Sequence, residues 1–93
     1  MTTRTERDEI RKEILACLSL APATAEMLGK ATDTTTASAA RRLAGLRSAG
    51  HVRVTGKLVW VDGVPKKQWA ITRGGEDWMR ANDPAYAEGW DAA

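Results

Sequence analysis

Basic side chains gather in the middle of this chain. Residues 41–73 carry eight Lys and Arg residues against one acid, Asp62, which gives the segment a net charge of +7. Residues 1–40 carry a net charge of −1, and residues 74–93 carry a net charge of −4. A basic centre between neutral and acidic ends is typical of a face that binds a polyanion, although a solvated charged surface has the same composition.

Groups that could do catalytic or metal chemistry are sparse. The sequence has one His, His51, and one Cys, Cys17. We interpret Cys17 as a small hydrophobe within a helix and His51 as a partly buried structural side chain. The acids are dispersed at helix-surface spacings, and Gly74-Gly75 lacks the pattern of a phosphate-binding loop. We therefore expect no catalytic residue, no enzyme activity, no cofactor and no metal site, with an all-carboxylate site left open.

The apolar pattern also bears on location. The first residues are polar and charged, unlike a signal peptide. No apolar run approaches the roughly 20 residues of a membrane span. We expect a cytoplasmic protein without a membrane partner, and no small-molecule ligand is evident.

Three segments have apolar residues at helical spacing. The first helix is expected over residues 5–19, with an inward stripe of Ile10, Ile14, Leu15 and Leu18. A short helix is expected over 24–30, capped by Thr24 and facing inward through Met27-Leu28. A third is expected from Thr35 to Gly50, with Ala39, Leu43 and Leu46 inward. The opposite face of this third helix has no large apolar side chain, so it is not core.

The pattern then changes to period two, which predicts a β-hairpin. The strands are expected over 52–60 and 67–71, joined by a loop at 62–66, with the tip at either Thr55-Gly56 or Asp62-Gly63. Residues 76–81 can form a last short helix, which Asp83-Pro84 ends. We expect Trp60, Trp69 and Trp78 in the core. The predicted organisation is one domain over residues 1–82 and a C-terminal tail over 83–93.

This order of elements resembles the winged helix-turn-helix transcription regulators of the MarR, ArsR and PadR kind. The resemblance rests on Leu43-x-x-Leu46-x-x-x-Gly50-His51-Val52 at the end of the third helix and on Trp69-Ala70-Ile71-Thr72-Arg73-Gly74-Gly75 after the hairpin. It implies an α+β fold: a winged helix-turn-helix of three helices followed by a β-hairpin wing and a short C-terminal helix.

The resemblance also implies the site. Helix 35–49 would enter the major groove, with the 57–71 hairpin as the wing. The expected DNA-binding residues are Thr35, Thr36, Ala37, Ser38, Arg41, Arg42, Arg47, Lys57, Lys66 and Lys67. The reading face has no Asn or Gln, so Arg41 is its one strong candidate for a base contact. A homodimer is implied, with an interface expected at Ile10, Ile14, Trp78, Tyr86 and Trp90.

Three functions remain open at this point. The first is a regulator of transcription, in the form of a repressor, that binds double-stranded DNA as a homodimer. The second is a winged helix that serves as a protein-interaction module, which the Ala-rich third helix favours. The third, binding of single-stranded nucleic acid or RNA, requires an exposed Trp beside the wing lysines. The first and second differ in whether the basic residues of the +7 segment converge on one surface with the third helix.

Overall fold

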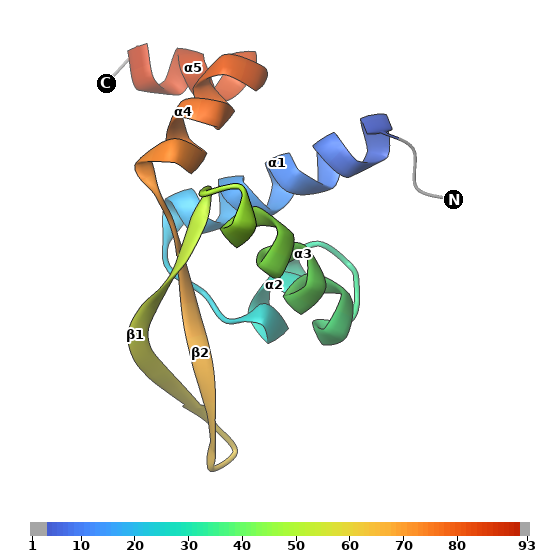
Figure 1. The fold of residues 1–93 in the computed structure, drawn as a ribbon, viewed down its shortest axis with the longest axis vertical. Coiled ribbons are helices and arrows are strands. Elements are labelled where there is room, and N and C mark those ends of the chain that lie inside the picture. The colour runs from blue at the N-terminus through green and yellow to red at the C-terminus, as the bar shows by residue number, and fades with distance from the viewer. Residues whose placement is uncertain (1–3, 92–93) are drawn as a thin grey trace.

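The computed structural model describes the backbone of residues 4–91 and the side chains of residues 7–87. Three helices precede a two-stranded antiparallel hairpin, and two short helices follow it (Figure 1). The bounds are α1 Arg4–Leu20, α2 Ala25–Ala31, α3 Thr36–Ser48, β1 Val52–Val61, β2 Val64–Ile71, α4 Arg73–Asn82 and α5 Pro84–Asp91. This is the expected α+β winged helix, with α2 and α3 as the helix-turn-helix and β1–β2 as the wing.

The core lies where α1, α2, α3 and α4 meet the base of the hairpin. The predicted inward stripe of α3 is confirmed, as is that of α1 except for Ile10, which is only partly buried against the core. The buried residues of the two stripes are Ile14, Leu15, Leu18, Ala39, Leu43 and Leu46. In α2 the prediction is half right, because Leu28 is buried whereas Met27 is 54% exposed. Adjacent residues of a helix point about 100° apart, and in α2 this turns Met27 away from the core that Leu28 enters.

Side-chain hydroxyls set where three helices begin. Thr24, Thr35 and Thr72 each precede a helix and accept a hydrogen bond from a backbone N–H two or three positions inside it. Thr24 is the cap that the sequence predicts, and Thr35 caps the helix that was expected to begin there. Thr72 starts α4 at Arg73, three residues before the expected start, so the Gly-Gly pair lies in the first turn of the helix.

The hairpin turns at Asp62-Gly63, one of the two predicted tips. Both residues have positive φ, 51° and 78°, as the tight two-residue turn of a hairpin requires. The expected loop over 62–66 is therefore too long, since β2 begins at Val64. Thr55-Gly56 instead lies in an irregular bulge, where the strand register shifts between Val54 and Leu58.

The segment expected as a tail contains helix α5. Asp83 ends α4 as predicted, but its carboxylate also accepts hydrogen bonds from the backbone N–H groups of Ala85 and Tyr86. Pro84 occupies the first helical position, where its fixed φ and missing N–H carry no penalty. The same Asp-Pro pair thus stops one helix and starts the next.

A close backbone contact joins α4 to the turn between α3 and β1. A Cβ placed on Gly75 would overlap the carbonyl oxygen of His51, and one on Gly74 would lie 3.0 Å from that of Gly50. Two hydrogen bonds reinforce the contact, from the Thr72 hydroxyl to the Gly50 carbonyl and from the Thr72 N–H to the His51 carbonyl. Through this close packing and these hydrogen bonds, the motif Thr-x-Gly-Gly fixes α3, the wing and α4 relative to one another.

His51 lies at this contact as a partly buried side chain, as expected. Its ring lies 5.9 Å from that of Trp78, and its Nδ1 is buried without a hydrogen-bond partner among the described residues. Burial lowers the pKa of His51 below 6.5, and the nearby positive charge of Arg11 lowers this pKa further. The fold thus favours the neutral imidazole.

We predict opposite effects on stability for two glycine substitutions. Gly75→Ala forces a Cβ against the His51 backbone and should lower the free energy of unfolding by about 1–3 kcal/mol. Gly45→Ala, on α3 with no atom within 4 Å of the new Cβ, should raise it by about 0.5–1 kcal/mol. Urea unfolding of both variants tests the contact, and equal stability of the two would contradict it.

We also predict that His51 makes stability depend on pH. Its pKa is below 6.5 in the folded protein, so the unfolded chain binds the proton more tightly. The stability that the neutral His51 side chain contributes is fully present above about pH 6.5, and it is lost as the pH falls through the pKa of His51 in the folded protein. The loss should be absent in His51→Leu, measured as the thermal midpoint between neutral and mildly acidic pH. A folded-state NMR titration that gives this single His a pKa of 6.5 or higher would refute the prediction.

Candidate nucleic-acid interface

The outer face of α3 is slim. A strip of small side chains runs along it, all of them exposed: Ala37, Ala40, Ala44 and Ser48. They share one side of the helix because successive members of the strip are three or four residues apart. A face without bulky side chains lets the helix backbone approach a flat or grooved partner closely, and the major groove, about 12 Å wide, admits such a helix.

The first turn of α3 carries hydrogen-bond donors. The Thr35 hydroxyl oxygen accepts from the Ser38 N–H at 3.0 Å, so that N–H is already satisfied. The N–H groups of Thr36 and Ala37 have no partner within the helix, since the first donors of any helix lack one. Both residues are exposed, so these donors are available to an anion such as a phosphate.

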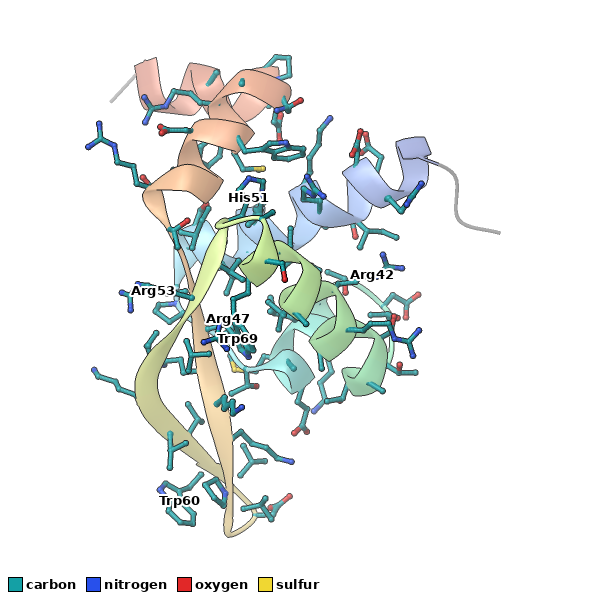
Figure 2. The ribbon with its side chains drawn as sticks, in the orientation of Figure 1. Arg42, Arg47, His51, Arg53, Trp60 and Trp69 are labelled. Carbon is teal, nitrogen blue, oxygen red and sulfur yellow. The ribbon has the colours of Figure 1, made fainter. Side chains whose placement is uncertain are left out.

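The arginines of α3 divide between two sides of the helix. Figure 2 shows Arg47 on the side of the wing and Arg42 on the side away from it. Arg41 and Arg47 are exposed and flank the strip of small residues. Arg42 is partly buried and lines a groove against α1. The structure therefore brings Arg41 and Arg47 to the outer face and separates Arg42 from it.

The wing lysines also divide. Lys67 pairs with Leu58 and Lys66 pairs with Val59, so the two lysines lie on opposite faces of the hairpin. Lys67 and Lys57 are exposed, and Lys66 is partly exposed. The Thr55 hydroxyl bonds the Gln68 side chain at 2.9 Å across the bulge, which holds the outer half of the wing to its base.

Trp60 is not in the core, contrary to the sequence-based expectation. It is 66% exposed near the wing tip, with Leu58 at 54% and Val64 at 48% (Figure 2). The alternation of strand residues groups Trp60 with the core residue Val52, but the hairpin extends past the helices, where nothing in the described chain covers it. Trp69 and Trp78 pack against the core as expected.

The cations of α3 and the wing lack acidic partners within the described part of the chain. The ion pairs found there are Lys12–Glu9 on α1, at 3.5 Å, and Lys30–Glu26 on α2, at 3.7 Å. Because no described carboxylate neutralises the basic side chains of α3 and the wing, this region presents an uncompensated positive charge.

The residues expected at a dimer interface have different surroundings. Ile14 is fully buried in the core of the single chain, so its side chain has no surface to offer a partner. Ile10, Trp78 and Tyr86 are partly buried against the core. The side chain of Trp90 lies outside the described residues.

Sequence reasoning missed Arg7 and Arg11, which face α3 across the groove that Arg42 lines. Their i,i+4 spacing puts them on one face of α1, but nothing in the local sequence links that face to residue 42. In the described residues, no three His, Cys, Asp or Glu side chains are close enough to share a metal ion. No described helix is long and apolar enough to cross a membrane.

Comparison with known proteins supports the fold. No protein-family model matches the chain. No curated protein matches it by sequence. Among solved structures, the chain is similar to a proposed transcriptional regulator from Thermoplasma acidophilum, with a TM-score of 0.72 and 17% identity. The likeness covers 99% of this chain and 91% of the other. At this identity, the similarity shows that the two chains share the winged-helix fold.

Proposed function

We propose that this protein is a transcription regulator that binds double-stranded DNA. The observation that carries the proposal is the uncompensated positive charge on α3 and the wing, next to a helix face of small side chains. A polyanion supplies the missing negative charge, and the slim face suits the major groove. A protein-interaction module has no need for both features together.

The residues divide into two roles under this proposal. Arg41 reads a base edge, because a guanidinium can make a bidentate contact with guanine worth about 1–3 kcal/mol. Thr36, Arg47, Lys57 and Lys67 contact phosphates and set the position of the domain on the duplex. Lys66 lies on the other face of the wing and reaches the flanking backbone where the wing meets it.

We further propose a homodimer that acts as a repressor. A two-fold protein would bind a pseudo-palindromic site with one α3 in each half-site. The partly buried Ile10, Trp78 and Tyr86, together with Trp90, are the proposed dimer contacts. A bound dimer of this size would act by occupying its site, which is how a repressor excludes other proteins.

Trp60 favours a second candidate, binding of single-stranded nucleic acid. Its exposed ring lies on the same hairpin as Lys57, Lys66 and Lys67. Stacking of a base on an exposed aromatic ring contributes about 1–3 kcal/mol per base. Single-strand binding requires an exposed Trp beside the wing lysines, and Trp60 meets this requirement, so the two candidates must be compared directly.

We predict that the protein binds a labelled random-sequence duplex with a steep salt dependence. The slope of log K against log salt should be about −3 or steeper, since each neutralised phosphate contributes about −0.9. Lys66→Ala and Lys67→Ala should each reduce the magnitude of the slope by about one. Arg80→Gln is the matched control, because it removes a charge on α4, away from the wing (Figure 1), and should leave the slope unchanged. Fluorescence anisotropy across a salt series measures these slopes.

A single-stranded oligonucleotide in the same assay separates the candidates. Tighter binding of the single strand than of the duplex, lost in Trp60→Leu, would favour the second candidate. No binding of either nucleic acid at low salt, where electrostatic attraction is strongest, would refute both and leave the interaction module.

A further inference from the structure

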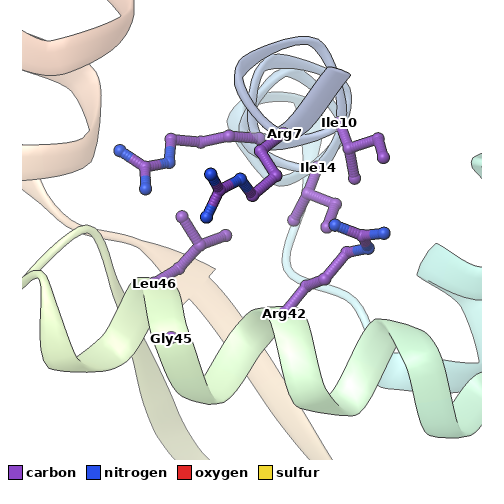
Figure 3. A pocket seen from close by; sticks show the side chains of 7 residues that line it. Arg7, Ile10, Ile14, Arg42, Gly45 and Leu46 are labelled. Carbon is purple, nitrogen blue, oxygen red and sulfur yellow. The ribbon is translucent and has the colours of Figure 1, made fainter. Parts of the chain in front are cut away.

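A groove between α1 and α3 is lined by arginines from both helices. Its inner part, of about 170 Å³, has an apolar floor and three guanidinium groups at its walls; the lining residues are Arg7, Ile10, Arg11, Ile14, Arg42, Gly45 and Leu46. An adjoining part, of about 240 Å³, is lined by Arg7, Ser38, Arg41 and Arg42. Figure 3 shows Arg7 extending from α1 toward α3 and Arg42 extending from α3 toward α1.

No acidic side chain lines either part of this groove. The arginines around it also have no ion pair with a described carboxylate. Arg11 is held in place by Trp78, since its guanidinium lies 5.1 Å from the ring centroid. Like charges placed around one hollow repel each other, and a bound anion converts that repulsion into attraction.

The chemistry of the lining selects among anions. Each guanidinium presents five N–H donors in a planar fork and stays charged at any ordinary pH. A carboxylate carries one charge and two oxygens, which one fork satisfies. A free phosphate or phosphate monoester carries about 1.5 to 2 charges and three or more terminal oxygens, so forks from two sides can bind it together. A backbone phosphodiester carries one charge, and its two terminal oxygens point apart, so each can accept from a different fork.

We propose that this groove binds a phosphate group, with Arg7 and Arg42 as its two forks and Ser38 and Arg41 at its mouth. Two sources supply that chemistry. One is a backbone phosphate of a duplex bound on α3, since Arg41 borders both the groove and the outer face; this source rests on the proposed function. The other is a free phosphate compound that occupies the groove independently of DNA.

The first test measures thermal unfolding in phosphate against chloride at equal ionic strength and pH. The midpoint of the wild type should rise by about 7 °C at a phosphate concentration tenfold above the dissociation constant. Arg42→Gln and Arg7→Gln should each weaken phosphate binding about tenfold or more, since each removes charge-assisted hydrogen bonds. Arg42→Lys, which keeps the charge but not the fork, should lose part of the effect. Arg53→Gln, an exposed arginine on β1, is the matched control and should retain all of it.

Two results of the unfolding test would contradict phosphate binding in the groove. No phosphate-specific shift in the wild type, or the same shift in all variants, would overturn the proposal. If Arg42→Gln does not fold in chloride, the comparison uses Arg7→Gln and Arg42→Lys instead.

A second assay, at constant ionic strength, distinguishes the two sources. If phosphate competes with duplex DNA for the wild type but not for Arg42→Gln, the DNA backbone is the source. Phosphate binding without competition identifies a free compound. A phosphate shift without any DNA binding would uphold this site while the proposed function fails.

Discussion

The arrangement of this domain depends on the contact between the first turn of α4 and the turn that joins α3 to β1. Gly74 and Gly75 lie against the Gly50 and His51 carbonyls at distances that leave no room for a Cβ on Gly75 and little room for one on Gly74. Thr72 caps α4 and bonds both carbonyls at once. One short segment thereby fixes where the recognition helix ends, where the wing begins and how α4 returns over α1.

The basic side chains are sorted by this geometry. Arg41 and Arg47 remain on the outer face of α3, whereas Arg42 turns toward α1 and meets Arg7 there. The wing extends beyond the helices and exposes Trp60 with lysines on both of its faces. The protein therefore has one broad basic surface on α3 and the wing and one compact basic groove beside it. The first suits a long polyanion, and the second suits a single phosphate group.

Much of the fold could be predicted because its causes are local. Helical spacing identified the buried stripes of α1 and α3, and Thr24 and Thr35 marked two helix starts correctly. The errors arose where one residue type has two uses. Asp83-Pro84 ends one helix and also begins the next. Trp60 falls on the same side of the strand alternation as the core residue Val52, although the strand has left the core at that point. Tertiary placement alone decides such cases.

The candidate site was predictable only in part, for the same reason. Periodicity identified the small-residue face of α3 and the exposed position of Arg41. It does not reveal that Arg42 lines a groove with Arg7, because that depends on how α1 crosses α3. Lys66 was expected in the loop at 62–66. That Lys66 and Lys67 lie on opposite faces of the wing follows only when the tip is known to be at Asp62-Gly63.

The most direct measurement of the central claim is an NMR titration of the labelled protein with duplex DNA, followed residue by residue. If α3 and the wing bind DNA, the backbone signals of Ala37, Ala40 and Arg41 shift together with that of Lys67 on the wing, and the signals of α5 do not change. Shifts confined to α4 and α5, or none at low salt, would contradict the claim that α3 and the wing form a DNA-binding surface.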